Sequence, residues 1–180
     1  MRKYFYLLAL FMSSYFINAQ SNTDQLINDA LIKAKSENKH VFVNYIADNG
    51  ELSKKMQQQM NNEACKPLYN SNYVVVTIVV SKEEADEYVN CSNPFKSFSE
   101  SNCEKIVFPF WYVLDDSGYC ISDSYRDTKE NMSYPSTKEK VESFVTVIRN
   151  TSKLTTPELD IIADTFHKMN NEQFYSSKTQ

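Results

Sequence analysis

The chain has 180 residues, of which 42% are hydrophobic and 23% are charged, and its formal charge is −4. This length and composition are typical of one globular domain and exclude a disordered or collagen-like chain. Only two glycines are present, Gly50 and Gly118, so neither a Rossmann dinucleotide-binding turn nor a P-loop can be built. The acidic balance also argues against a nucleic-acid partner.

Residues 1–19 have the pattern of a secretory signal peptide. A basic start and an apolar stretch from Tyr4 to Ile17 precede Ala19, a small residue suited to cleavage. The alternative is an uncleaved membrane anchor, but this stretch is about 21 Å long as a helix, against a hydrocarbon core of roughly 30 Å. We therefore expect residues 20–180 to form a single exported domain, periplasmic or secreted, with no membrane span after cleavage.

All four cysteines lie in the expected mature chain, where structural disulfides are the default for an even number. Three pairings are possible. Cys91 and Cys103 close a short loop within a polar insert at about residues 81–105, and a bridge there would reduce the entropy of the unfolded chain. We expect that bridge. Cys65 and Cys120 then form either a second bridge or two free thiols.

The first half of the chain alternates helical and strand patterns. Apolar residues recur at helical spacing over 22–38, and the run at 40–47 is rich in β-branched and aromatic residues, as in a buried strand. A second helix is expected to begin near Gly50, with Asp48 and Glu51 spaced as in a capping box. Lys66-Pro67 is expected to break or kink that helix.

The second half supplies the rest of a sheet and two helices. Residues 73–80 are almost continuously β-branched, which is typical of a strand covered on both faces. After the insert, 110–114 and 119–124 read as a hairpin around a turn that ends at Gly118. Helical patterns follow from about Ser136 and over 156–172. The sequence predicts an α/β protein with a mixed sheet of about four to five strands, helices on both faces and an extra C-terminal helix.

Three segments together resemble the thioredoxin-like superfamily, in particular its exported bacterial branch. Residues 30–43 are similar to the helix that leads into the family's central strand. Residues 45–56 end in Lys54-Lys55-Met56, similar to the Lys-x-Met that follows the family's Trp-Cys-x-x-Cys. Residues 107–118 (VFPFWYVLDDSG) are similar to its cis-proline strand and hairpin. The likeness covers about residues 24–150.

The chain departs from this family at the two redox cysteines. Aligning Lys54 and Met56 with the family's Lys-x-Met puts Gly50 and Ser53 where those cysteines belong. Disulfide exchange needs a thiolate, which a helix N-terminus helps to form from a cysteine but not from a serine hydroxyl. The resemblance therefore implies a degenerate loop without dithiol chemistry. No Cys-x-x-Cys spacing occurs elsewhere in the chain.

The resemblance also implies a conformation and a role for Pro109. In the family the corresponding proline is cis, faces the active loop, and has neighbours that dock an extended peptide. We therefore expect Phe108-Pro109 to be cis and to form a binding surface with Asp48, Asn49, Gly50 and Ser53. The alternative is that Pro109 only begins a strand.

No other residue pattern indicates a catalytic or metal site. His40 and His167 are isolated, so we expect neither a metal ion nor any other cofactor. The preferred interpretation is a non-catalytic module that binds an extended peptide or a partner protein. The alternatives are a thiol-disulfide oxidoreductase that uses displaced cysteines, or a structural subunit of a cell-envelope assembly.

Overall fold

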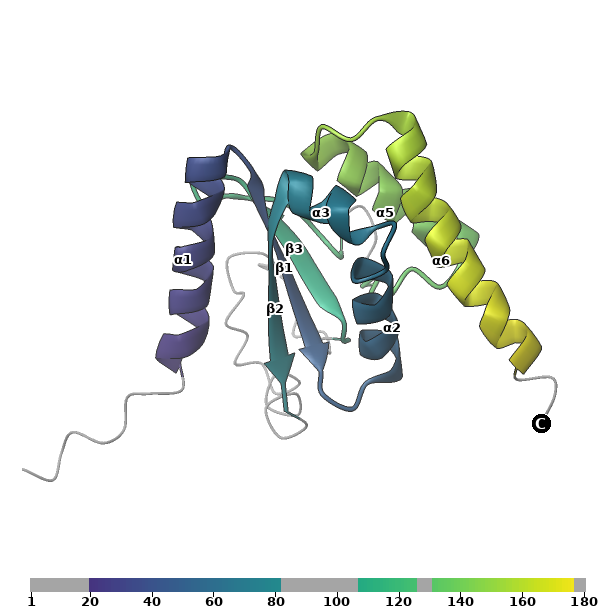
Figure 1. Ribbon diagram of the computed structural model, residues 1–180. Coiled ribbons are helices and arrows are strands. Elements are labelled where there is room, and N and C mark those ends of the chain that lie inside the picture. The colour runs from purple at the N-terminus through teal and green to yellow at the C-terminus, as the bar shows by residue number, and fades with distance from the viewer. Residues whose placement is uncertain (1–19, 82–106, 126–130, 177–180) are drawn as a thin grey trace, which may run out of the picture.

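The computed structural model describes residues 20–81, 107–125 and 131–176 (Figure 1). The expected signal peptide lies outside these ranges. So does nearly all of the expected insert, with Cys91 and Cys103, so the bridge between those two cysteines stays a prediction.

The element order agrees with the sequence patterns. In chain order the elements are α1 (Gln20–Glu37), β1 (His40–Ala47), α2 (Glu51–Met60), α3 (Lys66–Asn72), β2 (Tyr73–Val80), β3 (Phe110–Leu114), β4 (Cys120–Asp123), α5 (Lys138–Thr151) and α6 (Thr156–Ser176). The second helix expected from the sequence is two helices, because the chain leaves helical geometry after Met60 and starts again at Lys66, with Pro67 in the first turn of α3. The C-terminal helix is longer than expected and ends at Ser176.

The described strands form one mixed four-stranded sheet in the order β2-β1-β3-β4. β1 pairs with β2 in parallel and with β3 in antiparallel orientation, and β3 and β4 form the expected hairpin. Gly118 adopts a φ of 87° in the turn of that hairpin, a conformation that favours glycine. β1 is therefore a central strand, and its carboxyl end leads directly into the loop before α2.

Helices cover both faces of this sheet (Figure 1). α1 packs on one face, where Ala30 and Ala34 meet alternate residues of the strands such as Val43 and Tyr112. α2, α5 and α6 cover the other face, where Phe42 and Trp111 are fully buried in the larger core. Since successive side chains of a strand point to opposite faces, Phe110 and Trp111 enter different cores. The predicted fold class, an α/β sheet flanked on both faces with an added C-terminal helix, is confirmed.

The structure corrects one detail of the prediction and decides one alternative that the sequence left open. The N-cap of α2 is Gly50, which has no side chain, and no side-chain cap bond forms there, so Asp48 and Glu51 do not make a capping box. Glu51 instead pairs with Lys55, 3.2 Å away. The possible bridge between Cys65 and Cys120 is also absent, because each is a free thiol and they pack against cores on opposite faces of the sheet.

Candidate functional site

The loop between β1 and α2 is closed by its own hydrogen bonds. The backbone N–H of Gly50 donates to Ala47 O at 3.1 Å, and that of Asp48 donates to Val80 O at 3.1 Å. Ser53 is only 1% exposed, and its Oγ accepts a hydrogen bond from the Ala47 N–H at 3.0 Å. Asp48 and Asn49 are exposed, and the Asp48 carboxylate accepts from the Asn49 N–H at 2.7 Å. Asp48 and Asn49 are therefore accessible to solvent, whereas Ser53 is buried.

Gly50 and Ser53 are close neighbours across the first turn of α2. A Cβ placed on Gly50 would lie 2.9 Å from Ser53 Oγ and 3.2 Å from Ser53 Cβ. Cβ atoms in a disulfide are about 3.8 Å apart. The two positions thus have nearly the separation that a bridged pair needs, and neither holds a sulfur atom.

The Phe108-Pro109 segment lies beside the end of β1. The antiparallel register pairs Tyr45 with Phe110, the first residue of β3, so the Phe108-Pro109 segment precedes β3 at the edge of the sheet where β1 ends. The Phe108–Pro109 peptide bond is cis. Pro109 is buried and Phe108 is half-buried. Of the predicted site residues, Asp48 and Asn49 are exposed and Phe108 is partly accessible, whereas Ser53 and Pro109 are buried.

The free thiol of Cys65 belongs to a buried polar chain that joins three helices. Gln59 Nε2 donates to Cys65 Sγ at 3.6 Å, and the thiol lies 3.2 Å from Thr165 Oγ1 on α6. Gln59 Oε1 accepts from the Tyr69 hydroxyl at 2.9 Å. Burial raises the pKa of the Cys65 thiol above its ordinary value. Its environment thus favours the protonated thiol over the thiolate that exchange chemistry requires.

Cys120 is equally unsuited to exchange. Burial, with the negative charge of Asp123 as a smaller contribution, raises the pKa of its thiol to about 11. It lies on β4, next to β3 at the edge of the sheet away from β2, with its thiol donating to Ser122 O at 3.3 Å. Neither thiol that the structure describes is therefore placed or ionised like a redox cysteine.

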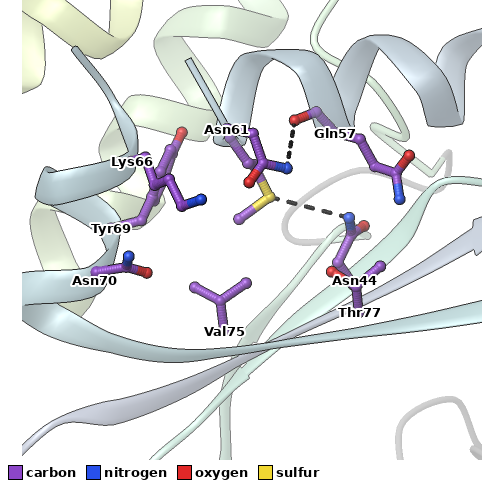
Figure 2. Close-up of a pocket in the computed structure, with 9 residues that line it drawn as sticks. Asn44, Gln57, Asn61, Lys66, Tyr69, Asn70, Val75 and Thr77 are labelled. Carbon is purple, nitrogen blue, oxygen red and sulfur yellow. Dashed lines mark hydrogen bonds between the residues drawn. The ribbon is translucent and has the colours of Figure 1, made fainter. Parts of the chain in front are cut away.

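A pocket that was not predicted from the sequence lies at the other end of α2 (Figure 2). Its volume is about 240 Å³, and it is bounded by β1, β2, α2 and α3. The lining residues are mostly polar: Asn44, Gln57, Met60, Asn61, Lys66, Tyr69, Asn70, Val75 and Thr77. One signal was available in the sequence, because Asn44 interrupts the apolar strand HVFVNYIA at a position that a buried strand normally gives to an apolar residue.

The described residues contain no cluster of three or more His, Cys, Asp or Glu side chains that would hold a metal ion. His40 lies at the start of β1, with Nδ1 2.8 Å from Thr151 O. Within the same ranges, no helix combines the length and apolar character of a membrane span.

The chain was compared with family models, curated proteins and solved structures. No family model and no curated protein matches the chain. Among solved structures, a disulphide isomerase from Xylella fastidiosa Temecula1 is similar at 17% identity and a TM-score of 0.50, over 87% of this chain and 95% of that one. A DsbH oxidoreductase is similar at 15% identity and a TM-score of 0.43, over 71% of this chain and 82% of the other.

At such low identity, these likenesses concern the fold and not the activity. The chain therefore has the thioredoxin-like fold that its sequence motifs predicted.

Proposed function

We propose that this protein is an exported, non-catalytic thioredoxin-like module that binds an extended peptide or a segment of a partner protein. The observation that carries the proposal concerns the two positions that the resemblance assigns to the redox cysteines: Gly50 has no side chain there, and the buried Ser53 hydroxyl accepts from the Ala47 N–H. A serine so placed supports the loop and supplies no nucleophile for a disulfide.

The proposed binding surface combines Asp48 and Asn49 with the accessible part of Phe108. Asp48 and Asn49 are exposed polar groups held on a loop that backbone hydrogen bonds fix on both sides. Phe108 adds a half-buried aromatic ring beside them. A fixed polar and aromatic surface at the end of a central strand suits a peptide that binds through its backbone and one or two side chains.

Insulin reduction tests the non-catalytic part of the proposal. The mature protein, with dithiothreitol as electron donor, is expected to reduce insulin no faster than dithiothreitol alone. Turnover above that background would contradict the proposal and favour displaced cysteines. Differential alkylation would then identify the bridge responsible, including one between Cys91 and Cys103.

A displayed library of extended peptides tests the binding part. Peptides that bind the wild-type protein should bind the variant Asn49→Arg at least about ten-fold more weakly, because a long charged side chain would occupy the surface. Gln58→Arg is the matched control, since Gln58 is an exposed residue on α2 away from the loop. Binding that both variants weaken equally, or that neither changes, would contradict this location.

A further inference from the structure

The pocket at the carboxyl end of α2 contains a buried polar group with an unmet hydrogen bond. Asn44 is 1% exposed, and its Oδ1 has no hydrogen-bond partner among the described residues. Its Nδ2 makes only a 4.0 Å contact to Met60 Sδ (Figure 2). A buried amide that loses its bonds to water without replacing them destabilises the folded protein. Such a group gives the pocket an acceptor that a hydrogen-bond donor entering it can satisfy.

The position of Asn44 follows from the sheet. It lies on the same face of β1 as Phe42, and it pairs in register with Thr77 on the edge strand β2. Thr77 is exposed, and Val75 on the same face is half-buried, so α2 and α3 leave this part of β2 uncovered. The amide is thus deep in the protein and still faces a space that is open at Thr77.

One positively charged side chain, that of Lys66, lines the pocket on the side of α3. Lys66, in the first turn of α3, is the only lining side chain with a full charge at neutral pH. It is exposed and makes no ion pair with any described residue. Figure 2 shows its amino group and the Asn44 amide facing the pocket from different walls. Val75 and Met60 supply an apolar surface between them.

The size of the pocket limits its ligand. The volume of the pocket is about 240 Å³. It lies below the usual range for drug-sized ligands, so the ligand is a small one.

We propose that this pocket binds a small carboxylate that also carries an amide, of the size of a dipeptide or an N-acylated amino acid. The ligand's amide N–H donates to Asn44 Oδ1, the atom without a partner among the described residues. Its carboxylate lies beside Lys66, and its aliphatic part contacts Val75 and Met60. The site is about 10 Å along α2 from Ser53, so it is independent of the peptide-binding surface proposed above.

N-Acetylglycine is the probe, because it carries an amide and a carboxylate within this size. In a ¹⁵N NMR titration of the mature protein, the side-chain amide of Asn44 and the backbone amides of Val75 and Thr77 should shift saturably. Propionamide and butyrate each carry half of the proposed chemistry and should bind at least about ten-fold more weakly. If none of the three shifts these signals at its highest soluble concentration, solvent satisfies Asn44 and the proposal is wrong.

Two variants separate the two contacts. Lys66→Met should weaken binding of N-acetylglycine about ten-fold and leave propionamide unchanged, since only the carboxylate loses its partner. Lys54→Met, an exposed lysine on α2 outside the pocket, is the charge-matched control and should change neither. Asn44→Leu should abolish the saturable shifts while the spectrum stays dispersed. Equal weakening by Lys66→Met and Lys54→Met would show non-specific attraction and overturn the site.

Discussion

The two ends of α2 treat a buried polar side chain in opposite ways. At the amino end, the Ser53 hydroxyl is 1% exposed and accepts from the Ala47 N–H. At the carboxyl end, the Asn44 amide on the neighbouring strand is just as buried, and its oxygen has no partner among the described residues. At the amino end of α2, which matches the family's active-site loop, the buried side chain already has its hydrogen-bond partner. We call this the closed end. At the carboxyl end, which the resemblance does not concern, the buried amide oxygen has no partner among the described residues, and we call this the open end.

The largest expected effect is a gain of activity at the closed end. In the double variant Gly50→Cys/Ser53→Cys, the two Cβ atoms start 3.2 Å apart, so a shift of a few tenths of an ångström allows a bridge. The N-terminus of α2 also stabilises a thiolate at position 50. We expect insulin reduction to rise from background to clear turnover.

Gly50→Ser is the control for that experiment, because it adds a side chain without sulfur and should stay at background. Failure of the double variant to form a bridge between positions 50 and 53, as mapped by mass spectrometry, would show that the loop is not spaced like a redox loop.

The next effect concerns the thiol of Cys120, whose pKa is raised to about 11, against an ordinary value of 9.0. At pH 8 the thiolate population is then about 100-fold smaller than that of an ordinary cysteine. Alkylation of Cys120 in the folded protein should be slower by about that factor, and its rate should rise with pH up to a midpoint near 11.

Peptide mapping after timed alkylation measures the rate at Cys120 separately from the other three cysteines. The same protein in denaturant provides the reference, where Cys120 should react as an ordinary thiol. A midpoint near or below 9 in the folded protein would reverse the conclusion that this sulfur is unreactive.

Removing the internal bond at the closed end should destabilise the protein. Ser53→Ala leaves the Ala47 N–H without its side-chain acceptor, and we expect the free energy of unfolding to fall by about 1–2 kcal/mol. Urea unfolding of the mature protein measures this loss. Ser143→Ala on the exposed face of α5 is the control and should change stability by less than about 0.5 kcal/mol. Equal stabilities of the two variants would mean that the Ser53 bond contributes nothing.

The smallest effect is expected at the open end. Asn44→Leu replaces an amide with an unpaired oxygen by an apolar side chain of similar size, so the unliganded protein should unfold with the same free energy or up to about 1 kcal/mol more. Urea unfolding of the Asn44→Leu variant measures this change in the free energy of unfolding. A loss as large as that of Ser53→Ala would show that the Asn44 amide is already satisfied in the folded protein, and the contrast between the two ends of α2 would fail.

Local sequence patterns were sufficient for most of the fold. The strands at 40–47 and 73–80 have the predicted bounds, because long β-branched runs have few alternative conformations. The helix start at Gly50 was also foreseen, but its cap was not, because a capping box depends on side-chain direction as well as on spacing. The proline segment precedes β3 at the edge of the sheet where β1 ends, and its role in a binding surface stays a prediction.

The pocket and the buried polar chain could not be predicted from the sequence. Gln57, Gln58 and Gln59 are identical in type, yet the first lines the pocket, the second is exposed and the third is buried against Cys65 and Tyr69. Only the rotation of α2 against the sheet distinguishes them, and that rotation is set by contacts distant in sequence. The unmet bond of Asn44 depends in the same way on which strand and helix are its neighbours.

The position of Cys65 gives the protein an internal reporter of its own motions. Its sulfur is fully buried and touches Gln59 on α2 and Thr165 on the C-terminal helix. A thiol reagent reaches it only when the packing of α2, α3 and α6 around it opens. The labelling rate of this one atom therefore measures how often that packing opens, without any added probe.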